Sequence, residues 1–133
     1  MKKLNLIIVL LSLSMASVAT EVEPEKPVQH LKLPAVTTLN EAEQVFLKKT
    51  EELKSFEVFD ASSLQEIHVI TYSLEKSLAY YVKHLTGKNK SLAEAMAAEV
   101  ERVHLNSENN RAKETQSHLN NYFRMAQYLP LTR

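Results

Sequence analysis

The strongest pattern in the sequence lies in a stretch of about twenty residues near its middle. Seven mostly apolar side chains recur there at alternating steps of three and four residues: Leu64, Ile67, Thr71, Leu74, Leu78, Tyr81 and Leu85. Because an α-helix has about 3.6 residues per turn, this spacing places all seven along one face of a helix, as in the seam of a helical bundle. No segment shows the two-residue alternation of a strand. The pattern therefore predicts an all-α protein.

Start and stop signals divide the rest of the chain into three further helices. Sequences of the form S/T-x-x-E, typical of a capping box, begin at Thr38 and at Ser91 and open the first and third helices. Asp60 is placed to cap the helix that carries the seam, and Gly87 to end it. The pair Asn109-Asn110 predicts a turn between a third and a fourth helix, since both are poor helix formers; one helix continuing through the pair is the alternative.

Short links between four amphipathic helices favour an antiparallel up-down four-helix bundle, because a short loop forces neighbouring helices to run in opposite directions. We assign this bundle to residues 38–129. Residues 130–133, which begin with a helix-stopping proline, are expected to form a tail. Residues 20–37 contain three prolines and no apolar periodicity, which predicts a disordered, extended arm before the bundle.

The first nineteen residues have the features of a secretory signal peptide. Lys2 and Lys3 precede an apolar run over residues 4–13, and Ser17-Val18-Ala19 supplies small residues for cleavage after Ala19. The run is shorter than the roughly 20 residues that span a bilayer. We therefore expect a periplasmic or secreted protein that is not embedded in a membrane once the leader is removed.

Composition excludes several classes of function. With 16 basic and 16 acidic residues, the chain lacks the positive excess of a nucleic-acid-binding protein. The absence of cysteine excludes disulfides, thiolate metal sites and a cysteine nucleophile. Gly87 is the only glycine, so a glycine-rich phosphate loop is impossible. Asp60 is the only aspartate and is predicted to cap a helix, which leaves a Ser-His-Asp triad unsupported. We expect a protein that is not an enzyme.

Residues with ligand chemistry occur at matching heights on the second and third helices. Counted from the loop between these helices, His68 lies as far before it as Glu108 lies after it, and Tyr72 as far before it as His104 after it. Equal rise per residue brings such pairs level in antiparallel helices. By angular position, His68 and Glu75 share one flank of the second helix, whereas Tyr72 is expected to point outward.

Whether this site forms depends on the hand of the bundle. In a bundle of one handedness, the flank with His68 and Glu75 faces the flank with His104. In a bundle of the opposite handedness the two flanks diverge, and the sequence does not determine which handedness forms. If the flanks meet, His68, Glu75 and His104, with Glu108 at the edge, form a candidate metal site. Two imidazoles with carboxylates suit zinc, copper, nickel or iron, and the alternative cofactor is haem, whose iron a single histidine can bind. The alternative is that no cofactor binds and that each histidine makes a hydrogen bond at the edge of the core. His84 and His118 are expected to be solvated.

Two short motifs resemble the signatures of a family. Glu66-Ile67-His68, Thr71-Tyr72, Leu74-Glu75 and Leu78 give the pattern IHxxTYxLE, and Val103-His104 with Ser107-Glu108 gives VHxxSE. These motifs resemble a domain-of-unknown-function family of small exported bacterial helical proteins. The resemblance spans residues 39–123 and implies no activity. It marks His68, Tyr72, Glu75, His104 and Glu108 as signature positions. The asparagine-rich third turn departs from the family, whose members more often have a Gly-Asp-like sequence there.

The leading functional prediction is an exported helical-bundle protein that acts without catalysis, by binding or by protein interaction. Val69 and Tyr80 lie away from the seam of their helix and could form the surface for a protein partner or a homodimer. One alternative is a metal- or haem-binding bundle that uses His68, His104 and nearby glutamates. Another is an envelope-stress, chaperone-like protein that offers apolar helix surface to its clients.

Overall fold

The computed structural model describes residues 32–132. It contains four helices in this part of the chain, which are α1 (Leu39–Lys54), α2 (Ala61–His84), α3 (Gly87–Glu108) and α4 (Ala112–Ala126). No β-strand occurs among the described residues, so the predicted all-α fold is confirmed. None of the described helices combines the length and apolar character that crossing a bilayer requires. The predicted signal peptide, residues 1–19, and most of the proline-rich arm lie outside the described residues.

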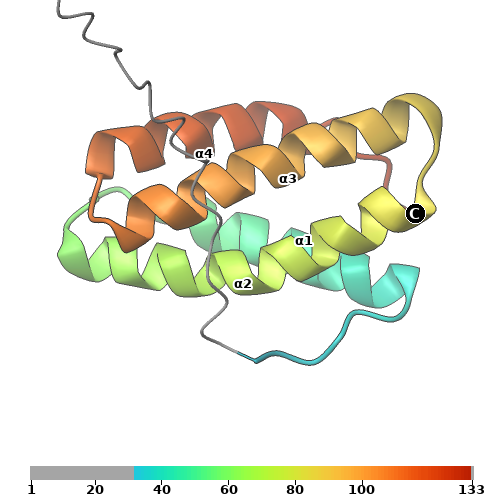
Figure 1. Ribbon diagram of the computed structural model, residues 1–133, viewed down its shortest axis with the longest axis horizontal. Helices are drawn as coiled ribbons and strands as arrows, with labels where there is room; N and C mark the ends of the chain where they lie inside the picture. Colours follow the sequence, from blue (N-terminus) through green and yellow to red (C-terminus); the bar gives the residue numbers. More distant parts are fainter. Residues whose placement is uncertain (1–31, 133) are drawn as a thin grey trace, which may run out of the picture.

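Successive helices run in opposite directions and pack side by side (Figure 1). α2 contacts α1 on one side and α3 on the other, and α3 also contacts α4. A hydrogen bond of 2.6 Å between the hydroxyls of Thr50 and Tyr122 joins α1 to α4 in the interior. α2 therefore has neighbours on two sides, which widens the part of its surface that must be buried.

The seam predicted on α2 forms the centre of the core. Six of its seven side chains are buried, from Leu64 to Tyr81, and Leu85 is partly buried just beyond the helix. Each fully buried large apolar side chain contributes roughly 1.5–3 kcal/mol relative to an exposed one. The core continues with Phe46 on α1, Met96 on α3 and Leu119 on α4. The three- and four-residue spacing of the seam residues thus mainly determines which side chains of α2 enter the core.

Local signals at three helix boundaries act as predicted. Thr38 and Glu41 form a complete capping box at the start of α1. Asp60 caps α2 by accepting a hydrogen bond of 2.9 Å from the backbone N–H of Ser63, and this bond lowers the pKa of its carboxyl group. Asn109 and Asn110 separate α3 from α4, with Asn110 in the left-handed region at φ 54°. The alternative of a continuous helix through this pair is therefore wrong.

Two predicted helix boundaries are wrong. α3 begins at Gly87 rather than at Ser91, and the Ser91 hydroxyl donates to the carbonyl of Gly87 instead of capping a helix end. Gly87, with φ 56°, does not end α2, which already ends at His84. The reason is that Leu85 and Thr86 are extended and complete the turn between α2 and α3 alone. The predicted bundle region, 38–129, includes three residues beyond the end of α4 at Ala126, and the last of them, Leu129, is buried in the core.

Two buried tyrosines differ in how their hydroxyl groups are satisfied. Tyr122 bonds to Thr50, and burial raises the pKa of its phenol. Burial also raises the pKa of Tyr81, to about 12, and its buried hydroxyl has no hydrogen-bond partner in the described part of the chain. Removing the Tyr81 hydroxyl would therefore break no hydrogen bond within the described residues.

Candidate metal centre

Three aromatic side chains from α2 and α3 meet inside the molecule. The ring centroids of His68 and His104 lie 4.5 Å apart, and that of Tyr72 lies 4.8 Å from His104. Both contacts are edge to face. The packing of α2 on α3 therefore has the hand that turns the two histidine flanks toward each other, which the sequence left open.

Tyr72 is part of this cluster, and the prediction that it points outward is wrong. Only 2% of it is exposed. Residues four positions apart lie on the same face of a helix, so Tyr72 stacks one turn beyond His68. Because α2 packs against both α1 and α3, its buried surface extends past the seam and includes this flank. Angular position relative to the seam alone does not reveal this burial.

His104 is completely buried, and only one of its ring nitrogens is satisfied. Its Nδ1 lies 2.8 Å from Oε1 of Glu75. A carboxylate only accepts hydrogen bonds, so Nδ1 carries the proton in this contact, and in the neutral ring Nε2 carries the lone pair. Nε2 is buried and makes no hydrogen bond within the described residues. Metal-binding histidines commonly have this arrangement, in which one ring nitrogen binds the metal and the other donates a hydrogen bond to a carboxylate that orients the ring.

Glu108 completes a group of three potential ligands with the two histidines. One ligand atom from each of His68, His104 and Glu108 lies within 4.8 Å of the others. Neighbouring ligands of a tetrahedral ion with bonds of about 2.0 Å are about 3.3 Å apart, so binding would draw the three together slightly. Glu108 is exposed and is the last residue of α3, where a small movement is easy. Glu75, predicted as a fourth ligand, instead holds the opposite nitrogen of His104.

The remaining histidines of the described helices lie elsewhere. His84 is exposed, as predicted, and stacks on Tyr80 with ring centroids 3.9 Å apart. His118 was predicted to be solvated, but it is half-buried, with its Nδ1 2.7 Å from Oε2 of Glu99. Since α4 packs against α3, this flank of α4 is partly covered. His118 and Glu99 resemble His104 and Glu75 in chemistry, but they belong to no group of three potential ligands in the described region.

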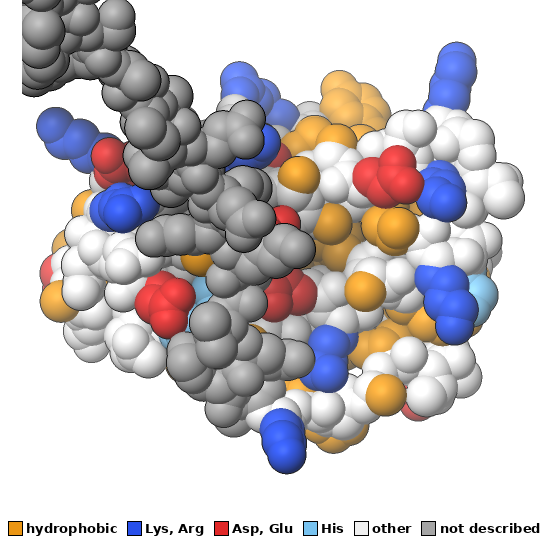
Figure 2. Space-filling model, viewed as in Figure 1, with side chains coloured by type: hydrophobic (Ala, Val, Ile, Leu, Met, Phe, Trp, Pro, Cys, Tyr) orange, Lys and Arg blue, Asp and Glu red, His pale blue; other side chains and the backbone are white. Residues whose placement is uncertain are grey.

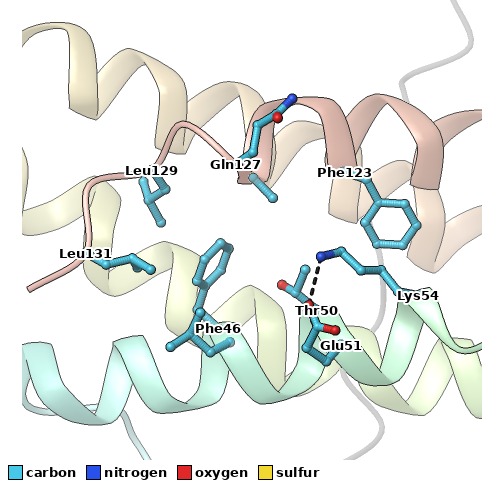
Figure 3. A pocket seen from close by; sticks show the side chains of 10 residues that line it. Phe46, Thr50, Glu51, Lys54, Phe123, Gln127, Leu129 and Leu131 are labelled. Carbon is cyan, nitrogen blue, oxygen red and sulfur yellow. Dashed lines mark hydrogen bonds and ion pairs between the residues drawn. The ribbon is translucent and has the colours of Figure 1, made fainter. Parts of the chain in front are cut away.

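A separate hollow lies between α1, α4 and the segment that follows α4. Its volume is about 280 Å³, and its walls include Phe46, Phe123, Leu129 and Leu131 (Figure 3). The ammonium group of Lys54 lies beside the hollow and is paired with Glu51 at 2.8 Å. None of the clustered residues on α2 and α3 lines this hollow, so it is independent of the candidate metal centre.

Charges on the face seen in Figure 2 are mixed in sign. Acidic and basic side chains alternate with apolar ones, and neither sign forms a continuous patch on the visible surface. This distribution agrees with the equal numbers of acidic and basic residues in the sequence.

A family model described as a family of unknown function, DUF6746, matches residues 1–130. The chain belongs to this family. The predicted membership in a domain-of-unknown-function family is thereby confirmed, and DUF6746 itself carries no activity that could be transferred to this chain. No curated protein and no solved structure matches the chain. For this DUF6746 protein, the function has to be inferred from the chemistry of its own cluster.

Proposed function

We propose that this protein binds a divalent transition-metal ion between α2 and α3, through His68, His104 and Glu108. Two imidazoles and one carboxylate form a ligand set of intermediate softness, which suits zinc, copper, nickel or iron(II). The single observation that carries the proposal is the buried Nε2 of His104, whose lone pair has no partner while Nδ1 is held by Glu75.

An unsatisfied nitrogen at this depth has a free-energy cost. A buried hydrogen-bonding group without a partner destabilises the folded state by about 1–3 kcal/mol. A metal ion would supply the missing partner and remove that penalty. An ordinary hydrogen bond at the edge of the core explains only the Nδ1 contact of His104. The pair of His118 and Glu99 is an example of such a bond at the edge of the core, because the His118 side chain is 26% exposed, whereas that of His104 is enclosed.

The geometry supports a small ion better than haem. Two histidines that bind one haem iron approach it from opposite faces of the macrocycle, which must lie between the rings. Here the rings of His68 and His104 touch edge to face, with centroids 4.5 Å apart. A single ion fits between them after a small adjustment, whereas a porphyrin does not.

The proposed role is binding without catalysis, in the periplasm or outside the cell. The leader predicted at residues 1–19 supports export. The burial of His68, Tyr72 and His104 limits the access of a substrate to the ion, which supports binding without catalysis. A role in protein interaction is the second candidate. It is supported by Val69, which is 44% exposed on α2.

Zinc titration of the chain from residue 20 onward tests the proposal. After removal of metals by a chelator, we expect calorimetry to show one equivalent of Zn²⁺ bound to the wild type. In His104→Ala the affinity should fall at least about 100-fold, because the anchored ligand is lost. His118→Ala removes the matched histidine and should bind zinc as the wild type does.

Two results would contradict the proposal: no zinc uptake by the wild type, or equal uptake by His104→Ala. Far-UV circular dichroism checks that each variant keeps its helices. His104→Leu, which fills the interior with an apolar side chain of similar size, replaces the alanine variant if that one unfolds.

Glu75→Gln is expected to weaken zinc binding by about 10–100-fold without removing a ligand. The amide can still accept the hydrogen bond from His104 Nδ1, but it lacks the negative charge that makes Nε2 a stronger donor to the metal. Competition with a chromophoric chelator measures the change. Glu99→Gln, which alters the matched carboxylate beside His118, should leave the affinity unchanged. An unaltered affinity in Glu75→Gln would mean that Glu75 does not act on the metal site.

A further inference from the structure

The three proposed ligands leave one position of a four-coordinate ion unfilled, and the phenol oxygen of Tyr72 lies 3.1 Å from Nε2 of one of them, His68. We infer that the phenol oxygen of Tyr72 is the fourth ligand, so that the site is closed and prefers an ion that binds phenolate, such as Cu²⁺. The inference rests on the proposed metal site and adds to it the identity of the last ligand and the class of ion.

The spacing of the donor atoms supports this assignment. The hydroxyl oxygen of Tyr72 lies 3.1 Å from Nε2 of His68. Adjacent ligands with bonds of about 2.0 Å are about 2.8 Å apart in the square-planar arrangement that Cu²⁺ prefers and about 3.3 Å apart in a tetrahedral one. The hydrogen bond between these two side chains therefore holds their donor atoms at nearly the separation that a shared ion requires.

The ring of Tyr72 is also fixed in this position. It packs edge to face on both imidazoles, with ring centroids 5.0 Å from His68 and 4.8 Å from His104. Its position four residues after His68 on α2 keeps both donors on one face of the helix. Such a ring would lose little further freedom when an ion binds.

The charges of the proposed ligands balance the ion. Burying an isolated charge is strongly unfavourable, so a buried site is most stable when ligands neutralise the ion. His68 and His104 bind as neutral imidazoles, and Glu108 supplies one negative charge. Deprotonation of Tyr72 supplies the second, so the charges of the four direct ligands sum to zero with that of a divalent ion. In this step an oxygen–metal bond replaces the oxygen–hydrogen bond, and the proton passes to bulk water.

Copper titration of the chain from residue 20 onward tests the inference. Cu²⁺ bound to phenolate gives a ligand-to-metal charge-transfer band in the visible region, which imidazole and carboxylate ligands alone do not produce. We expect this band in the wild type at one equivalent of Cu²⁺. It should disappear in Tyr72→Phe, which still binds copper through the other three ligands and releases one proton fewer. Tyr81→Phe is the matched control, because it removes another buried phenol of α2 that makes no hydrogen bond, and it should keep the band.

The outcomes separate this inference from the proposed function. If the wild type binds one Cu²⁺ in a manner that requires His104 but shows no band, Tyr72 only orients His68, and the inference is wrong. A band retained in Tyr72→Phe would overturn it as well. If the wild type binds no copper, the proposed function fails together with the inference. If Tyr72→Phe folds poorly, resonance Raman spectra of the wild type show whether a phenolate binds copper, because the vibrations of a bound phenolate are enhanced in them.

Discussion

Saturating zinc should raise the free energy of unfolding of the wild-type chain by about 4 kcal/mol when free zinc is 1,000 times its dissociation constant. The increase follows because the folded chain assembles His68, His104 and Glu108 within 4.8 Å, whereas an unfolded chain does not hold them together. Urea unfolding with and without Zn²⁺, followed by circular dichroism, measures the shift.

His104→Leu provides the control for this measurement. It should abolish the zinc-dependent shift, and its metal-free form should be at least as stable as the metal-free wild type. Leucine removes a buried nitrogen that has no hydrogen-bond partner, and Glu75, whose side chain is 27% exposed, can bind water instead. A metal-free His104→Leu variant that is much less stable than the wild type would indicate that His104 has a structural role.

Leu74→Ala should destabilise the metal-free protein by about 3–4 kcal/mol, because it leaves a cavity in the centre of the core. Leu74 is fully buried on the seam of α2. Urea unfolding of the metal-free variant measures the loss. Leu47→Ala is the matched control, since Leu47 is 43% exposed on α1 and its truncation should change stability by no more than about 0.5 kcal/mol. If Leu74→Ala and Leu47→Ala lowered the free energy of unfolding equally, Leu74 would not lie in the centre of the core.

Features set by neighbours in the sequence could be predicted well. The seam of α2 depends only on spacing along one helix, and the capping bonds of Thr38 and Asp60 join residues three positions apart. Asn110 ends α3 for an equally local reason, because its left-handed conformation interrupts the helix. Such interactions do not depend on how the helices pack.

The candidate site depends on packing and was only partly predictable. Spacing placed His68 level with Glu108, and Tyr72 level with His104, but the hand of packing between α2 and α3 decided that these side chains meet. The same packing buried Tyr72 and placed Glu75 behind His104 rather than beside Glu108. Gly87 illustrates a different ambiguity. Its left-handed conformation fits either side of a short turn, and here it begins α3.

The position of the cluster along α2 and α3 has a mechanical consequence. These helices are joined through Leu85 and Thr86 at one end of the hairpin, while His68 and Glu108 lie toward the opposite, open end. An ion bound there would cross-link the two helices, so that they could not separate at the open end without breaking coordinate bonds. Metal occupancy would then determine how often this hairpin opens locally.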